Sequence, residues 1–196
     1  ALGSINTPDL KIWTAEDPVE ITQYRLRQVQ VAHKIGFTFE RAMRAFLRAD
    51  PDVIMVGEMR DLETTQAGIE ASLTGHMVFS TLHTNSAPET VTRLLDMGID
   101  PFSFGDSLLG VLAQRLCRRL CKECKEKSMP NSAEWEALVS AYGGPEPWKL
   151  HDMPASPIEI YRPKGCKICN NLGYKGRVGL HELMAIDNDL RGCIYK

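Results

Sequence analysis

The sequence predicts an α/β protein built on a parallel sheet, with a small metal-binding module near its end. Three short apolar segments (residues 11–15, 53–56 and 77–82) alternate with segments of helical periodicity. This alternation is typical of parallel sheets whose two faces are covered by helices. Two Cys-x-x-Cys pairs follow, and such pairs are typical of metal-binding knuckles.

The composition fits one globular domain with a small appendage. The chain has 196 residues, of which 43% are hydrophobic, and a formal net charge of −2. Because this balance creates no basic field, we expect no nucleic-acid partner. No apolar run reaches the roughly 20 residues of a membrane span, and no signal-peptide pattern opens the chain, so we expect a cytoplasmic protein. There is no initiator Met, and a helix start at residues 187–190 lies close to the end, so we expect a fragment of a longer protein.

Each predicted strand leads into chemically active side chains. The carboxyl ends of parallel strands meet at one edge of a sheet, where ligands of such folds bind, so these side chains should lie together. They are Glu16 and Asp17 after the first strand, Glu58 and Arg60 after the second, and His83 after the third.

Two amphipathic helices are predicted between the strands. The third strand should be followed by a helix with a clear start and stop, because Ser86 and Glu89 are spaced as a capping box, Pro88 lies in the first turn and Gly98 can end it. Apolar residues of the first two helices are Phe39, Ala42, Met43, Phe46 and Leu47 in one, and Leu62, Ile69 and Leu73 in the other.

A longer helix is predicted for residues 104–120. Arg115, Arg118 and Arg119 would lie in its last turn, where cations complement the helix dipole. An intersubunit or phosphate contact is an equal alternative for these arginines.

The segment 125–163 differs in composition and reads as an insertion within the metal module. Its many prolines and glycines break any long period, apart from one short predicted helix at residues 132–142.

The carboxylates suggest nucleotide chemistry, with simpler alternatives. Glu16 and Asp17 precede Pro18, which keeps the backbone extended, and this geometry suits the polarisation of a water; an ordinary solvated loop is the alternative. Glu58 follows four apolar residues in a Walker-B-like pattern and would hold Mg²⁺, with Arg60 beside it; the alternative is a surface ion pair at the end of a buried strand.

His76 and His83 bracket the third predicted strand. Seven residues of extended strand separate them by roughly 23 Å, so they cannot share one metal. His83 is placed to donate to a terminal phosphate.

The chain contains no Gly-x-x-x-x-Gly-Lys-Ser/Thr motif and no Gly-Lys pair. Phosphoryl transfer depends on the backbone amides and the lysine of such a loop. We therefore expect this chain alone to be inactive in nucleotide hydrolysis.

Four of the six cysteines form the two pairs and predict a structural zinc site in a reducing compartment. The gap between the pairs is longer than that of a short zinc ribbon. Cys117 and Cys193 are expected to be buried or incidental thiols. The predicted ligands are Cys121, Cys124, Cys166 and Cys169.

Five segments resemble the GspE/PilB family of type II secretion and type IV pilus assembly ATPases. They are TAEDPVE, DPDVIMVGEMRDLETTQAG, TGHMVFSTLHTNSA, AQRLCRRLCKEC and GCKICNNLGYKGRVGLHELM. The resemblance implies a RecA-like P-loop NTPase core in which the Walker A loop, which would hold ATP and Mg²⁺ tightly, lies upstream of this chain. The tetracysteine pattern favours assembly or secretion over pilus retraction.

The resemblance also implies roles for individual residues. Glu16 is similar to the Asp-box glutamate that activates the attacking water, Glu58 to the Walker-B glutamate near Mg²⁺, and Arg60 belongs to the same box. His83 is similar to the His-box histidine that senses the γ-phosphate, and His76 to the first histidine of that box. Asp17 is expected to contribute to nucleotide binding.

We expect the chain to divide into three regions. These are a RecA-like core at 1–113, a tetracysteine zinc subdomain at 114–176, and the start of a C-terminal helical subdomain at 177–196. The implied function is a homo-hexameric, ATP-hydrolysing motor that powers pilin or pseudopilin polymerisation through an inner-membrane platform protein, and that reaches the membrane only through its partners. The alternative is a non-catalytic, zinc-bearing scaffold. A zinc-dependent nucleic-acid binder is disfavoured, because no basic stripe with stacking aromatics is evident.

Overall fold

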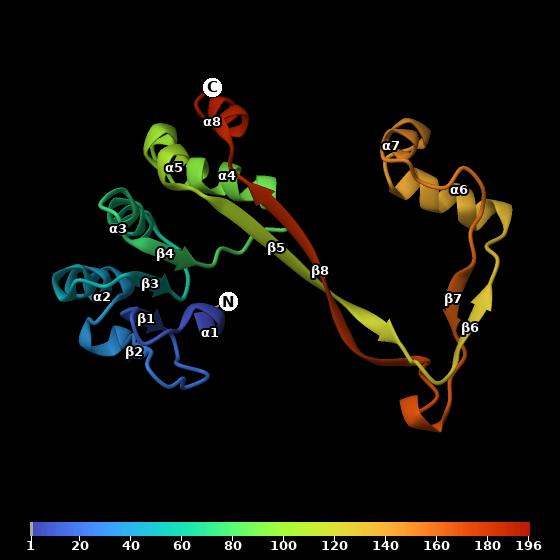
Figure 1. Ribbon diagram of the computed structural model, residues 1–196, viewed down its shortest axis with the longest axis horizontal. Coiled ribbons are helices and arrows are strands. Elements are labelled where there is room, and N and C mark those ends of the chain that lie inside the picture. Colours follow the sequence, from blue (N-terminus) through green and yellow to red (C-terminus); the bar gives the residue numbers. More distant parts are fainter. Residues whose placement is uncertain (1) are drawn as a thin grey trace. The chain divides into compact units, whose positions relative to one another are not determined.

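The computed structural model describes residues 2–196, and the chain divides into two compact units (Figure 1). One unit holds the chain up to Gln114 together with His181–Lys196, and the other holds Arg115–Leu180. The boundary falls within two long strands, β5 (Gly110–Leu120) and β8 (Tyr174–Ala185), which pair as a two-stranded sheet.

A parallel four-stranded sheet lies at the centre of the first unit. Its order is β2-β1-β3-β4, and all three pairings are parallel. The predicted strands are confirmed as β1 (Ile12–Glu16), β3 (Val53–Val56) and β4 (Met77–Ser80). The fourth strand, β2 (Arg27–Gln30), was not predicted.

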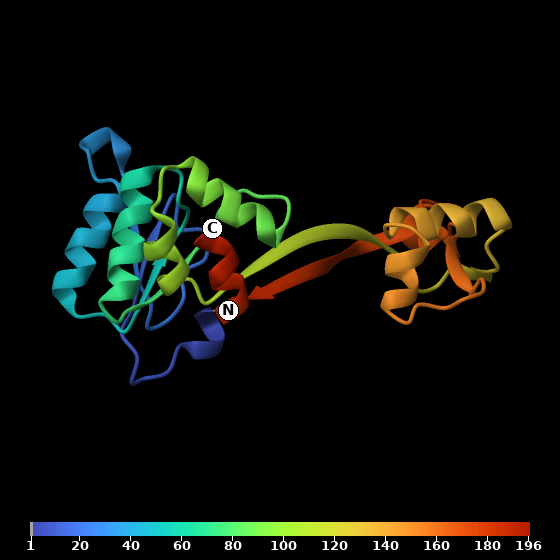
Figure 2. The ribbon, with the colours of Figure 1, turned by 90° about the horizontal axis from the view of Figure 1, so that it is seen from above.

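The two predicted helices, α2 (Phe39–Phe46) and α3 (Leu62–Leu73), lie side by side (Figure 2). Helix α2 buries its predicted apolar face in one cluster with Ala15, Ile54 and Val56 of the sheet. Helix α3 begins at Asp61, whose side chain accepts a hydrogen bond from Thr64 N at 2.8 Å.

The buried side of α3 consists of small residues rather than of the leucines at its ends. Leu62 and Leu73 are 38% and 53% exposed, respectively. A Cβ atom at Gly68 would lie only 2.3 Å from Cε of Met59, so the helix packs closely. Its buried residues are Thr64, Thr65, Gly68 and Ala71.

A second cluster joins α4 (Ala87–Asp96), α5 (Pro101–Ser107) and α8 (Asn188–Ile194) around buried Leu94, Ile99, Phe104 and Ile194. The predicted cap of α4 is present, because Ser86 accepts from Glu89 N at 3.4 Å, and Gly98 follows the helix at φ 82°. The reciprocal bond differs from a capping box: the Glu89 carboxylate accepts from Asn85 N, one residue before the cap. The predicted start of α8 is confirmed by its cap, Asp187.

The prediction of one helix over residues 104–120 is wrong. Helix α5 ends at Ser107, and β5 takes up residues 110–120. The segment is rich in Leu and Arg, which favour helix locally, but its long-range pairing with β8 outweighs that weak preference.

The three arginines of this segment therefore end no helix and complement no dipole. The Arg118 guanidinium lies 4.5 Å from the ring centroid of Tyr174, and Arg119 Nε donates to the Lys175 carbonyl at 3.4 Å. Both contacts are made to β8, and Arg115 lies in β5 with them.

The second unit carries a hairpin of β6 (Lys125–Ser128) and β7 (Ile160–Pro163), with two helices between the strands. The predicted short helix is confirmed as α6 (Ser132–Ala141), which a capping box of Asn131 and Glu134 starts. Helix α7 (Pro145–Leu150) carries Trp148, whose buried ring lies edge-on to those of Trp135 and Tyr142.

Short helical elements complete the fold. They are α1 (Leu2–Ile5) and three single turns, η1 (His33–Ile35), η2 (Leu47–Ala49) and η3 (Lys167–Cys169). Among residues 2–196, none of the helices combines the length and the hydrophobicity that a membrane span requires.

Candidate functional site

The chemically active strand ends gather at the carboxyl edge of the sheet, as predicted from its parallel order. Three hydrogen bonds tie the chain together just beyond the strands. Gly57 N donates to Ala15 O at 2.8 Å, Met59 N donates to Thr81 O at 3.0 Å, and Thr81 Oγ1 donates to Gly57 O at 2.6 Å. The segments that carry Glu16, Glu58 and His83 are therefore neighbours.

Glu58 carries a largely buried carboxylate at this edge, with its side chain 14% exposed. Arg60 Nε lies 2.5 Å from Oε2, and His83 Nε2 lies 3.4 Å from the same oxygen. Among residues 2–196, however, no group donates a well-directed hydrogen bond to this buried oxygen. Arg60 is thus paired with Oε2 by charge but without hydrogen-bond geometry, and a metal ion at Glu58 would share the carboxylate with it.

Glu16 is the last residue of β1, and two side chains hold its carboxylate. Thr14 Oγ1 donates to Oε1 at 2.5 Å, and Gln28 Nε2 donates to the same oxygen at 2.9 Å. Asp17 follows and lies 3.4 Å from His33 Nε2, and the Asp17–Pro18 peptide bond is cis.

Both glutamates line one cleft with a volume of about 360 Å³. Its walls come from β1, β2, β3, the loop after β1 and the start of α2. This is the edge at which ligands of open parallel α/β sheets bind. Residues in its lining include Glu16, Asp17, Gln28, Phe39, Met55 and Glu58.

His76 does not join this group. It precedes β4, whereas the cleft lies at the ends of the strands. Its Nδ1 lies 3.0 Å from Ala71 O and 3.3 Å from Thr74 Oγ1, in the turn that ends α3. Its predicted contact with nucleotide stays a prediction. The contacts that it makes in the structure connect the end of α3 to the start of β4.

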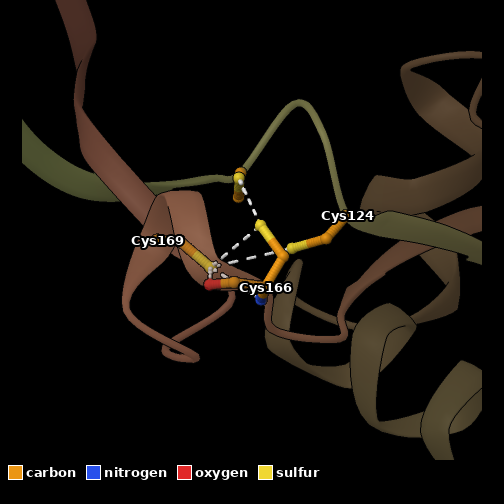
Figure 3. Close-up of side chains that lie close together, drawn as sticks. Cys124, Cys166 and Cys169 are labelled. Atoms are coloured by element: carbon orange, nitrogen blue, oxygen red, sulfur yellow. Dashed lines mark hydrogen bonds between the residues drawn. The ribbon is translucent and has the colours of Figure 1, made fainter.

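The second unit holds the predicted cysteine cluster, in which four sulfur atoms lie within 4.8 Å of one another. Cys121 and Cys124 flank the turn from β5 to β6, Cys166 immediately precedes η3, and Cys169 is the last residue of η3. Figure 3 shows Cys124, Cys166 and Cys169 close together. The Sγ separations are 3.9 Å for Cys121 and Cys166, 3.8 Å for Cys124 and Cys169, and 3.7 Å for Cys166 and Cys169. Four thiolates on two knuckles are the donor set of a structural tetrahedral zinc site.

The electrostatics of the four sulfurs also suit a cation. Burial raises the pKa of the Cys124 thiol to about 12. Burial acts in the same direction on Cys169, but the amides of Cys166 and Gly173 donate to its sulfur and lower its pKa to about 6. The opposite directions of the two shifts mean that a negative charge on one sulfur disfavours a second one beside it, and a bound dication would favour the deprotonated form of all four thiols.

Cys117 and Cys193 lie outside this cluster. Both thiols are free and exposed, so of the two expected alternatives, buried or incidental, burial is wrong. Cys117 lies in the extended strand β5 rather than in the helix predicted for residues 104–120.

The profile of the family described as "Type II/IV secretion system protein" matches residues 1–196. The chain belongs to this family. It is 49% identical over 195 residues to the type II secretion system ATPase E of Vibrio cholerae, and this alignment covers 99% of the chain and 36% of that protein. It is 48% identical over 194 residues to the type IV pilus assembly ATPase PilB of Myxococcus xanthus, and this alignment covers 99% of the chain and 33% of that protein. The chain thus spans about a third of the length of these curated relatives.

Solved structures agree with the assignment to the type II/IV secretion family. The pilus retraction motor PilT with bound ADP superposes with a TM-score of 0.63 at 27% identity, over 99% of this chain and 44% of that one. The Legionella pneumophila ATPase DotB has a TM-score of 0.56 at 24% identity, over 95% of this chain and 40% of that one, and shares the fold.

Two residues of this family member's site, Thr14 and Gln28, were not predicted. Gln28 lies on β2, the strand that was not predicted, although the alternation Gln28-Val29-Gln30-Val31 is a signal of a half-buried strand. Thr14 lies within a strand that was predicted, but no local pattern shows that its hydroxyl faces Glu16.

Proposed function

We propose that this chain is the downstream part of an ATP-hydrolysing motor of type II secretion or type IV pilus assembly. The observation that carries the proposal is that Glu16, at the end of β1, and Glu58, just beyond the neighbouring strand β3, line the same cleft at the carboxyl edge of a parallel sheet. The names of the Vibrio cholerae and Myxococcus xanthus relatives support the assignment to ATP hydrolysis and to these two machineries.

Each residue of the edge has a distinct role in the proposal. Glu16 orients the attacking water and accepts its proton. Glu58 holds Mg²⁺ directly or through water, because it brings a carboxylate, the type of ligand that Mg²⁺ prefers, into the lining of the cleft. His83 donates to the terminal phosphate from its exposed position beside Glu58, while Arg60 and Asp17 contribute to nucleotide binding. When bound, Mg²⁺ neutralises charge on the phosphates.

The rest of the machinery is proposed from the family. A phosphate-binding loop upstream of this chain supplies the amides and the lysine that hold the nucleotide. The four cysteines hold zinc, which stabilises the second unit without taking part in the reaction. In the proposal the motor is a hexamer that contacts the inner-membrane platform of its apparatus from the cytoplasm.

The decisive test is ATP hydrolysis by a chain extended upstream to the length of its relatives. Glu58→Gln keeps the shape of the side chain and removes the charge that supports Mg²⁺, so we expect kcat to fall by about 100-fold or more. Glu16→Gln should have a similar effect. Glu63→Gln, on an exposed side chain of α3, is the matched control and should leave kcat unchanged.

Two results would overturn the motor proposal: no hydrolysis by the extended, zinc-loaded chain, or full activity of Glu58→Gln. Either would favour the alternative of a zinc-bearing scaffold, for which the compact cysteine cluster in its own unit is the supporting observation.

A further inference from the structure

We infer that Gln28 and Thr14 are positioning residues for Glu16: together they hold one oxygen of its carboxylate and leave the other available to the attacking water. The inference rests on the proposed function, in which Glu16 acts on that water. It assigns roles to two residues that have none in the proposed function.

The register of the sheet brings the three side chains together. Thr14 and Glu16 are two residues apart on β1, so they lie on the same face of the sheet. Gln28 pairs with Thr14 across the β1–β2 ladder and therefore lies on that face as well. This arrangement follows from strand pairing and does not depend on the loop that joins the strands.

Both hydrogen bonds go to the same carboxylate oxygen. Thr14 Oγ1 and Gln28 Nε2 approach Oε1 of Glu16 at 2.5 Å and 2.9 Å, respectively. Among residues 2–196, no side chain contacts Oε2 within hydrogen-bonding distance, so Oε2 is the oxygen that a water in the cleft can reach. A carboxylate held in this way presents one defined acceptor instead of rotating between two.

The amide of Gln28 is itself fixed by the backbone of the loop that follows β1. Gln23 N donates to Gln28 Oε1 at 2.7 Å, which identifies that atom as the oxygen. The second hydrogen of Nε2 goes to Ile21 O at 3.0 Å. Since the orientation of the amide is set by these two backbone groups, Gln28 presents an N–H group, and not an oxygen, to Glu16.

Thr14 is the more rigid of the two donors. Its side chain is fully buried, and a buried hydroxyl needs a partner, which Glu16 provides. The loop residues that orient Gln28 also line the cleft, so the loop and the carboxylate are linked through one side chain. A substitution at Gln28 should therefore alter the positioning of the attacking water and leave the binding of the phosphates unchanged.

The test uses the upstream-extended chain, with kcat and the KM for Mg·ATP measured separately. Gln28→Met and Thr14→Val keep the approximate volume and remove the donor. Each should lower kcat by about 10- to 100-fold and change KM by less than about threefold, because a misplaced reacting group can cost up to about 100-fold in rate. Thr14→Ser retains the hydroxyl and should restore most of the activity.

Gln66→Met is the matched control, since Gln66 is an exposed glutamine on α3 and the cleft lining does not include it. It should leave kcat unchanged. Thermal unfolding of every variant shows whether it folds. If Gln28→Met fails to fold, the pair Thr14→Val and Thr14→Ser still carries the test.

Double variants separate positioning from a general structural effect. If Gln28 acts through Glu16, then Gln28→Met added to Glu16→Gln should lower kcat no further than Glu16→Gln alone. Additive losses, or full activity of both Gln28→Met and Thr14→Val while Glu16→Gln is inactive, would overturn the inference and leave the proposed function intact. An active Glu16→Gln enzyme would overturn the role of Glu16 itself, and the inference with it.

Discussion

Nε2 of His83 lies 3.4 Å from Oε2 of Glu58, and this contact joins the ends of two neighbouring strands, β4 and β3. The His83 side chain is 86% exposed, whereas that of Glu58 is 14% exposed. The imidazole is therefore free to turn toward a ligand, while the carboxylate stays in place.

We expect His83→Ala in the upstream-extended chain to lower kcat for ATP by about 100-fold, because a donor to the developing negative charge is lost. Affinity for ADP, which lacks the terminal phosphate, should change little. Steady-state kinetics and ADP titration check both statements. His181→Ala, on exposed β8, is the control. Equal losses of ADP and ATP affinity would contradict a role at the terminal phosphate.

His76→Ala should affect stability rather than catalysis. The substitution removes the contact of Nδ1 with Ala71 O, and a typical hydrogen bond contributes about 1 kcal/mol to the free energy of unfolding. Chemical denaturation of this chain measures that loss, and kcat of the extended chain should stay within about twofold of the wild type. A large fall in kcat at unchanged stability would instead support the nucleotide contact that the family resemblance implies for His76.

Removal of metal should loosen the second unit and leave the parallel sheet intact. Structural zinc contributes an apparent binding free energy of about 10 to 16 kcal/mol in small domains, and that energy stabilises the fold around it. We expect chelation, or Cys124→Ser, to increase amide exchange within residues 115–180 while β1, β3 and β4 stay protected. Cys117→Ser, at an exposed thiol outside the cluster, should change neither metal content nor exchange. Unchanged exchange in the second unit after chelation would refute a structural role for the metal.

At low pH, helix α6 should unfold before the rest of the second unit. Glu134 accepts hydrogen bonds from Arg162 and from the cap amide of Asn131, which lower the pKa of its carboxyl below the ordinary 4.5. Because the pKa of Glu134 is lower in the folded state than in the unfolded state, the ionised carboxylate stabilises the fold above about pH 4.5. This stabilisation is lost as the pH falls through the pKa of the folded state. Fluorescence of Trp135 and Trp148 should report this transition below about pH 4.5. In Glu134→Gln the acid transition should disappear, and its persistence would assign the change to another group.

Much of the candidate site was predictable because the strands are parallel. Each catalytic candidate follows an apolar run directly, and the edge at which such strands end is common to all of them, so Glu16, Glu58 and His83 come together without knowledge of the strand order. The two cysteine pairs were predictable because each depends on a Cys-x-x-Cys spacing, and the structure brings the two pairs together.

Two of the sequence predictions failed because each relied on a local pattern. The segment 110–120 carries local helix preference, yet it pairs with a strand more than fifty residues away, and no local pattern reports such pairing. The buried side of α3 was misjudged because small residues such as Gly68 and Ala71 pack closely by virtue of their size, which a count of large apolar residues does not detect.

The sequence by itself determined the family, the parallel α/β class, the strand ends that carry carboxylates and the two Cys-x-x-Cys pairs, because each depends on patterns among residues close in the chain. Only the tertiary structure decided which partners these groups contact. Thr14 and Gln28 donate hydrogen bonds to Glu16, His83 lies beside Glu58, and His76 contacts the end of α3. The physical reason is that a hydrogen bond between elements depends on the register and facing of strands and helices, which the packing of the whole unit sets.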